Sequence, residues 1–193
     1  MGLPIQRGFS RAYFGNGFRG DGFFWIHVLA ILAAWCTFVL IFIGGLVTST
    51  GSGLAVPDWP LAFGQVFPKM VGGVFYEHGH RIAASIVGII TTVLTIWICL
   101  KEKRKWVRVL SLVALGSVIL QGLLGGITVL LELPTAVSVA HAFFAQVFFC
   151  VMVALALVTH PRWKDPGTLD STPRGRTSLG TRRLCIATTT AVF

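Results

Sequence analysis

Four long apolar runs dominate this sequence and restrict what it can fold into. They cover residues 23–48, 82–100, 107–131 and 135–158, and apart from Arg108 near the start of the third run none contains Lys, Arg, Asp or Glu. A helix rises about 1.5 Å per residue, so each run can cross a hydrocarbon core of roughly 30 Å. Because a membrane core offers no water to backbone groups, we expect each run to be helical. The sequence therefore predicts an all-α integral membrane protein, a four-transmembrane-helix bundle.

Basic residues gather at one end of the predicted bundle. Thirteen of the 16 Lys and Arg residues precede the first run, join the second to the third, or follow the fourth. Arg108 lies at the start of the third run on the same side, and only Lys69 and Arg81 fall in the other two connections. The positive-inside rule then places the N-terminus, the second connection and the C-terminal segment in the cytoplasm. Topology thus explains the net charge of +9, and we expect no nucleic-acid partner.

The charge pattern also divides the chain. Residues 1–22 are expected to be a cytoplasmic lead, 23–158 the four-helix transmembrane unit, and 159–183 a basic cytoplasmic linker. Residues 184–193 read as the start of a fifth apolar span that is too short to cross, so the chain looks cut off there. The first run is too long for the core of a cleaved signal peptide, so we expect it to be retained.

Two features qualify this simple outline. The connection over residues 49–77 is rich in Gly and Pro but also carries Trp59, Phe63 and Phe67, so we expect it to pack on the bundle as a lid.

The cysteines show no CxxC spacing, which favours a role as small packing residues over a disulfide or a zinc site. They are Cys36, Cys99, Cys150 and Cys185.

Two histidines stand at matching positions, each near the start of an apolar run on the side away from the basic connections. His80 lies at the start of the second run and His141 at the start of the fourth. Ionisable side chains at the ends of membrane spans are costly and usually have a function. Two neutral imidazoles are a common pair of axial ligands for haem iron. The alternative is that each is an interfacial histidine bonded to water or backbone.

Polar neighbours of these histidines are further candidates. Glu77 precedes His80 by three residues and would share its helix face, where it could relay a proton or simply favour the helix start. Arg81 could contact a haem propionate or extend to the interface. His78 would point away from His80 around the helix and is a candidate for a supporting role. Gln121 is strongly polar within the third run, where a hydrogen bond between helices is favoured.

Three other polar residues fit less demanding roles. Gln146 also favours a hydrogen bond between helices. His27 and His160 map to the basic edge, where an interfacial position is favoured over a second haem.

A weak internal repeat links the two halves of the predicted bundle. Gly44-Gly45 and Gly125-Gly126 each lie near the end of a run, and each is followed by a connection that leads to a histidine-bearing helix. Two tandem helix pairs would place the second and fourth helices parallel to each other. The alternative is ordinary close packing of glycines between membrane helices.

Five motifs occur in a fixed order along this framework. They are 44–54 (GGLVTSTGSGL), 56–60 (VPDWP), 77–81 (EHGHR), 121–126 (QGLLGG) and 140–141 (AH). In order and spacing they resemble the N-terminal half of the haem A synthase family of cytochrome oxidase assembly proteins, over residues 35–157. The resemblance implies half of an eight-helix architecture built from two similar four-helix halves.

The resemblance also implies an activity and a site. Family members oxidise the C8 methyl group of haem O to the formyl group of haem A. Glu77 would be the catalytic carboxylate, His80 and His141 the axial iron ligands, and Arg81 a further haem-binding residue. Haem O would be the substrate in this half, and a haem b is expected in the second half. Haem O synthase and oxidase assembly factors are implied as partners beside membrane lipid, and homo-oligomerisation is left open.

The chain departs from the family pattern in two ways. Many relatives carry a cysteine pair in the first outer loop, where this chain has Ala55-Val56 and Leu61-Ala62, so that disulfide is absent. The second half is also missing, which leaves the activity of this chain alone open. The competing interpretation is a non-catalytic membrane protein that binds haem through two histidines, as an electron carrier or haem chaperone. A bacterial plasma membrane is favoured over the mitochondrial inner membrane.

Overall fold

The computed structural model describes residues 22–160 and residue 163. The expected cytoplasmic lead before Gly22, most of the expected linker, the short fifth run and Cys185 lie outside these residues. The compact unit described below ends at Thr159.

Four helices make up this unit. All four are long and apolar enough to cross a membrane, and the described residues contain no strand beyond one isolated bridge between Ala62 and Gln65. The predicted all-α membrane bundle is therefore confirmed. The helices are α1 (Gly22–Ser49), α2 (Gly73–Lys101), α3 (Lys105–Leu130) and α4 (Thr135–Val158).

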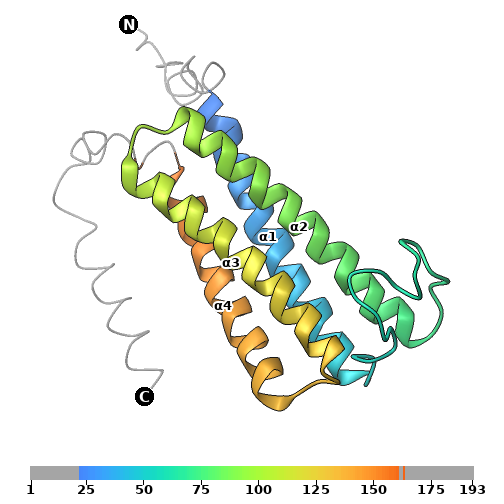
Figure 1. Cartoon of the computed structure of the whole chain (residues 1–193). Coiled ribbons are helices and arrows are strands. Elements are labelled where there is room, and N and C mark those ends of the chain that lie inside the picture. Colours follow the sequence, from blue (N-terminus) through green and yellow to red (C-terminus); the bar gives the residue numbers. More distant parts are fainter. Residues whose placement is uncertain (1–21, 161–162, 164–193) are drawn as a thin grey trace, which may run out of the picture. The chain divides into compact units, whose positions relative to one another are not determined.

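The helices pack as a ring in which each contacts its neighbours. The closely packed pairs are α1 with α2, α2 with α3, α3 with α4, and α4 with α1. The chain runs up and down, so that α2 and α4 are parallel and occupy diagonal corners (Figure 1). We call the end with the connection between α2 and α3 the basic end. We call the opposite end the lid end, and residues 50–72, which join α1 to α2 there, the lid.

The hydrophobic core lies from the middle of the bundle to the basic end. Its fully buried members come from every helix but stop near the helix midpoints. Other buried apolar side chains, namely Val56 and Ala62 of the lid and Val129 near the end of α3, lie outside this cluster. The cluster comprises Ile26, Ala30, Ala33, Val87, Leu94, Ile98, Val107, Ala114, Phe148, Met152, Leu155 and Val158.

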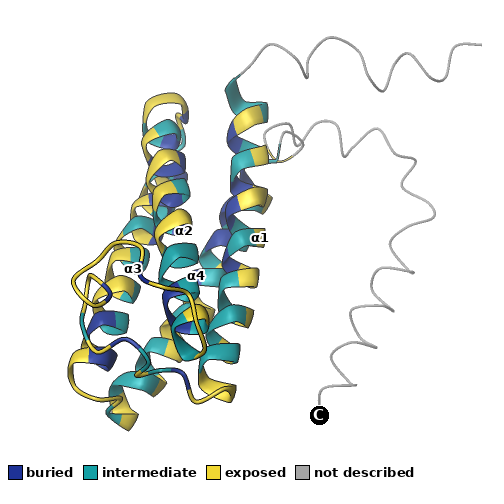
Figure 2. Cartoon of the chain, turned by 90° about the vertical axis from the view of Figure 1, so that its right-hand side faces the viewer, coloured by how far each residue is buried: buried dark blue, intermediate teal, exposed yellow. Residues whose placement is uncertain are grey.

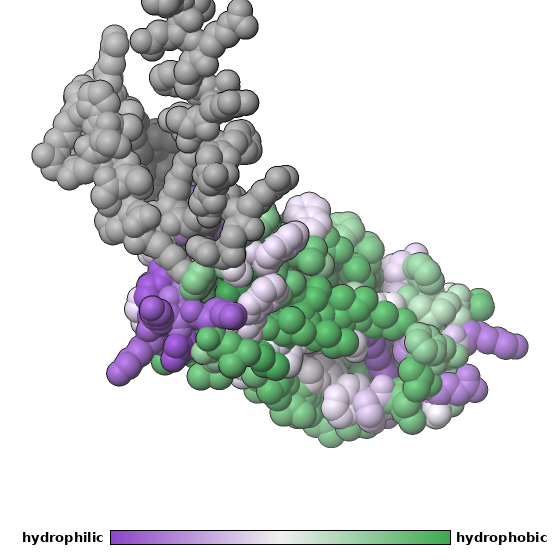
Figure 3. Space-filling view, turned by 90° about the horizontal axis from the view of Figure 1, so that it is seen from above, coloured by the Kyte–Doolittle hydropathy of each residue, from purple (hydrophilic) through white to green (hydrophobic). Residues whose placement is uncertain are grey.

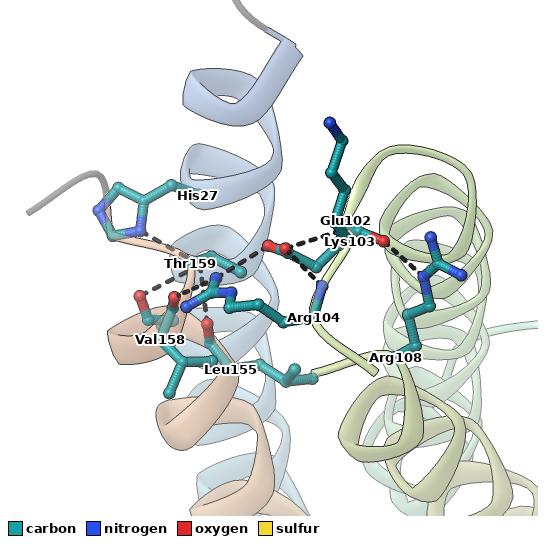
Figure 4. Close-up of polar contacts among 9 residues, drawn as sticks. His27, Glu102, Lys103, Arg104, Arg108, Leu155, Val158 and Thr159 are labelled. Atoms are coloured by element: carbon teal, nitrogen blue, oxygen red, sulfur yellow. Dashed lines mark hydrogen bonds and ion pairs between the residues drawn. The ribbon is translucent and has the colours of Figure 1, made fainter. Parts of the chain in front are cut away.

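A buried acidic residue fastens the basic end. The Glu102 carboxylate accepts from the main-chain N–H groups of Lys103 and Arg104 at 2.9 and 3.1 Å. The Arg104 guanidinium bridges this carboxylate, at 2.8 Å, to the carbonyl oxygen of Val158 at 2.9 Å, and Arg108 donates to the Glu102 carbonyl (Figure 4). The connection between α2 and α3 is thereby joined to the end of α4. A paired, hydrogen-bonded carboxylate explains how a charge is buried among basic residues.

Large apolar side chains cover the outside of the bundle. Figure 3 shows a hydrophobic band between hydrophilic groups at the two ends, and exposed positions lie along the outer face of every helix (Figure 2). Trp35, Phe42, Ile89 and Phe143 are each more than 60% exposed. Such a surface suits contact with lipid rather than water.

The start of α2 differs from the span boundary inferred from hydropathy. The apolar run begins at Ile82, whereas the helix begins at Gly73 and includes the polar stretch from Glu77 to Arg81. Gly72, at a φ of +59°, precedes the first turn. The polar residues of these first turns bind the lid, as described below, so the helix extends beyond the apolar segment.

Candidate functional site

The imidazole of His80 lies against Gly44 of α1. A Cβ atom built on Gly44 would lie 3.1 Å from His80 Cε1, which is tighter than ordinary contact. The neighbouring Gly45 has nothing within 4 Å of such an atom. Gly44 therefore provides the space in which the ring of His80 packs.

The second histidine repeats this arrangement. A Cβ atom on Gly125 of α3 would lie 3.4 Å from Cε1 of His141. Main-chain groups one turn earlier, at Leu40 and Gln121, interact with the rings of His80 and His141 respectively. Each histidine thus packs against the first glycine of the Gly-Gly pair in the helix that precedes its own, which supports the internal repeat.

The two imidazoles lie near enough to each other to form one candidate site. Their charges are close enough to interact, and they stand on the diagonal helices α2 and α4. With neighbouring axes about 8–10 Å apart, diagonal axes of a square bundle are about 11–14 Å apart. Diagonal axes at this separation are compatible with a thin, planar ligand held between the two histidines.

The donor set fits haem better than a bare metal ion. Among the described residues, no three His, Cys, Asp or Glu side chains gather as a metal site. Haem iron needs only two axial ligands from protein, since the macrocycle supplies the other four. Nδ1 of His80 is also buried without a hydrogen-bond partner, and the hydrophobic core does not extend into this half.

Glu77 does not face solvent but holds the lid. Its side chain is buried, and Oε2 accepts from the main-chain N–H of Val56 at 2.8 Å. Its other oxygen, Oε1, pairs with the guanidinium of Arg81 one turn later. The carboxylate predicted to be catalytic is therefore bound between α2 and the lid.

Arg81 makes most of its contacts with main-chain oxygens of the lid. Nη1 donates to the carbonyl oxygens of Asp58 at 2.7 Å and Leu61 at 2.9 Å, and Nη2 donates to that of Val56 at 3.2 Å. Contact with a haem propionate would have to replace or share these bonds. The geometry gives Arg81 a clear task as an anchor of the lid.

Two aromatic side chains complete the attachment. Nε2 of His78 lies 3.0 Å from the carbonyl oxygen of Val66, which makes it the donor to that oxygen. The indole of Trp59 packs on α3, where a Cβ atom on Gly126 would lie 2.7 Å from ring atoms Cδ2 and Cε2. The lid is thus fastened to both α2 and α3, above the two histidines.

Asp58 organises the tip of the lid. Its carboxylate accepts from the main-chain N–H groups of Phe63 at 2.7 Å and Gly64 at 2.8 Å. Phe63 and Gly64 both have positive φ values, and the carboxylate ties this turn together. The hydrogen bonds from Gly64 and Phe63 lower the pKa of Asp58 below its ordinary value.

The remaining predicted polar residues lie elsewhere. His27 is at the basic end, where Nδ1 lies 3.4 Å from the hydroxyl of Thr159 (Figure 4). His160 follows α4 in the sequence, and Gln146 is exposed on α4. Neither His27 nor Gln146 shares the site of His80 and His141.

Sequence reasoning missed how the lid is attached. Asp58 and Trp59 were visible only as part of a motif, and their contacts join residues that are distant in sequence. The signal that could have found them is the density of Gly, Pro and aromatic residues in a connection that must cover polar helix ends.

The sequence matches a known protein family. A family model described as cytochrome oxidase assembly protein matches residues 27–72 and 69–193. The heme A synthase of Alkalihalophilus pseudofirmus is 28% identical over 154 residues, which cover 78% of this chain and 52% of that protein. No solved structure matches the chain.

Two further relatives are somewhat more similar over shorter stretches. The heme A synthase of Shouchella clausii is 32% identical over 130 residues, 66% of this chain and 43% of that protein. That of Oceanobacillus iheyensis is 34% identical over 128 residues, 64% of this chain and 41% of that protein. The chain spans about half the length of the curated relatives it matches.

Proposed function

The chain belongs to the cytochrome oxidase assembly protein family, and from that membership we propose that it forms the haem O-binding half of a haem A synthase. The observation that carries the proposal is the pair His80 and His141, which pack in equivalent glycine-lined positions on diagonal helices beneath one lid. The names of the relatives support the reaction class.

The proposed reaction converts the C8 methyl group of haem O to a formyl group. Successive hydroxylations of one carbon lead to the aldehyde level with loss of water, and they require oxygen and electrons from outside this half. The family resemblance implies a haem b in the second half, and such a group would supply electron transfer. The product would serve cytochrome oxidase assembly, with haem O synthase as the enzyme that supplies the substrate.

The side chains would then divide the work. His80 and His141 would hold the iron of the substrate and fix the macrocycle in the bundle. Glu77 is the carboxylate that accepts or relays a proton near the reacting edge. Arg81 keeps Glu77 and the lid in place, and its charge favours nearby propionates. The lid excludes water from the site.

We further propose the membrane orientation that the basic residues imply. The basic end faces the cytoplasm of a bacterium, and the lid and both histidines lie near the outer face of the plasma membrane. Residues 1–22 and 159–183 would then be cytoplasmic, with a further apolar span beginning at residue 184.

One observation favours the alternative function, a haem-binding protein without catalysis. The described contacts of Glu77 are with Arg81 and with the N–H of Val56, so the carboxylate has a structural task that an electron carrier or haem chaperone would equally need.

Haem extraction distinguishes these functions. The chain is expressed in a host supplied with haem O, purified in detergent, and its haems are extracted and identified by mass. Haem O or its oxidised products are expected for a synthase half. Haem b alone would favour the alternative, and the absence of any haem would contradict both.

A further inference from the structure

The side-chain amide of Gln121 on α3 sits between the ring of His141 and the backbone of α4. One polar end of the amide lies 3.1 Å from Nδ1 of His141 and 3.2 Å from the His141 carbonyl oxygen, and the other end lies 3.1 Å from the N–H nitrogen of Ala145. One amide thus contacts a candidate iron ligand and the main chain on either side of one helical turn.

The backbone of α4 fixes which way this amide points. A carbonyl oxygen can only accept and a main-chain N–H can only donate, so the amide nitrogen must face His141 and the amide oxygen must face Ala145. The nitrogen that faces His141 also faces Nδ1, which must then accept. In a neutral imidazole with an accepting Nδ1, the proton is on Nε2.

No side-chain amide occupies the equivalent position beside His80, whose ring interacts with the main chain of Leu40. Nδ1 of His80 is buried without a hydrogen bond, and the position that corresponds to Gln121 in the first repeat, one turn before Gly44, is Leu40. The two halves of the repeat therefore differ at the residue that faces the histidine.

We propose that Gln121 is a positioning residue that holds His141 with its proton on Nε2, and that this makes His141 the weaker of the two iron ligands. The second part rests on the proposed function. An axial histidine usually offers the Nε2 lone pair to iron and donates from Nδ1 to an acceptor. For His141 to donate from Nδ1, Gln121 would have to turn its amide oxygen toward the ring and lose both hydrogen bonds to α4. No side-chain amide imposes this cost on His80.

Unequal ligands suit a haem that is a substrate rather than a resident cofactor. A substrate must bind, react and leave, and one readily released ligand allows this while the other keeps the macrocycle in place. The inequality would come from a residue that contacts neither iron nor macrocycle.

The first test needs no haem. The full chain is labelled with nitrogen-15 in its histidine rings, and ring nitrogen resonances are assigned with H141A. We expect Nδ1 of His141 to be unprotonated and hydrogen-bonded, and to move toward the free unprotonated position in Gln121→Leu. The control Gln146→Leu should leave it unchanged. A protonated Nδ1, or no change in Gln121→Leu, would overturn the proposal.

A second variant covers the case in which Gln121→Leu does not fold. Gln121→Glu retains side-chain length, and an ionised carboxylate can only accept. We expect it to draw the proton of His141 to Nδ1. If the proton stays on Nε2 in this variant, residue 121 does not control the tautomer and the proposal fails.

The second test measures ligand inequality with haem O. In the wild-type background, His80→Ala is expected to weaken haem binding about tenfold more than His141→Ala, a difference within the range that outer-shell partners produce. In the Gln121→Leu background the difference should shrink. A larger loss for His141→Ala would overturn the inequality. If no haem binds at all, the proposed function fails, while the haem-free measurement still decides the role of Gln121.

Discussion

Gly44 and His80 pack so closely that a side chain at position 44 would crowd the imidazole. An alanine Cβ at position 44 would lie 3.1 Å from Cε1 of the imidazole, while the same atom at position 45 would meet nothing within 4 Å. Positions 44 and 45 are adjacent in one helix, so a Gly→Ala change has the same effect on helix propensity at both. Any difference between the two variants then reports the contact with the ring of His80.

Gly44→Ala should therefore displace the ring of His80 and weaken haem O binding by about tenfold. This is the lower end of the loss in affinity that follows when residues supporting a metal ligand are changed. Titration of the purified chain with haem O measures the change. Gly45→Ala is the matched control and should bind as the wild type does. Equal affinities in the two variants would show that this contact does not position His80.

Gly126→Ala should loosen the lid. The new Cβ would lie 2.7 Å from the indole of Trp59, and overpacking of this kind costs about 1–3 kcal/mol. Hydrogen exchange of lid residues 56–62 should accelerate accordingly. Gly122, on the same helix, has nothing within 4 Å of its Cβ position, so Gly122→Ala should leave exchange unchanged. A protected lid in Gly126→Ala would mean that Trp59 does not anchor it.

The lid tip should depend on pH through Asp58. Hydrogen bonds from Gly64 and Phe63 lower its pKa below the ordinary 3.8. A lowered pKa means that the carboxylate stabilises the folded tip above the ordinary value, and that this contribution is lost as pH falls through the lower folded pKa. The amide proton shift of Gly64 should titrate with a midpoint below 3.8, and Asp58→Asn should abolish the transition. A midpoint at or above 3.8 would contradict the described bonding.

Glu77→Gln should separate catalysis from binding. The amide oxygen can still accept from Val56, so the lid and haem affinity should persist, whereas loss of a proton-accepting carboxylate should slow haem A formation by about 10²–10⁴-fold. The measurement is haem composition in membranes that contain the chain together with the rest of the protein.

Arg81→Lys serves as the companion variant for Glu77. It removes the guanidinium that links Glu77 to three lid carbonyl oxygens but keeps the carboxylate. We expect a looser lid and partial activity. If Arg81→Lys and Glu77→Gln abolish haem A formation equally, Glu77 acts by holding the lid rather than by proton transfer.

The helices were predictable because an apolar run in a membrane has few alternatives to a helix. The start of α2 was not, since the stretch from Glu77 to Arg81 has no apolar period, and its polar side chains bind the distant lid. Hydropathy likewise could not place Glu102, a buried acid among basic residues whose partners include the end of α4.

The residues of the candidate site were predictable from local motifs, but the contacts that hold the lid were not. The order of motifs indicated His80, His141 and Glu77, and the Gly-Gly repeat indicated that the two histidines are equivalent. The position of Trp59 on Gly126 and the engagement of Arg81 by the lid depend on contacts between distant segments, which no local pattern encodes. The roles of the site residues remain predictions.

The most direct test of the paired-histidine site is the absorption and electron paramagnetic resonance spectrum of the purified chain loaded with haem O, compared with His80→Ala and His141→Ala. The wild type should give low-spin signals of two axial imidazoles, and each variant should lose them. Low-spin signals that survive unchanged in either variant would show that His80 and His141 do not share one haem.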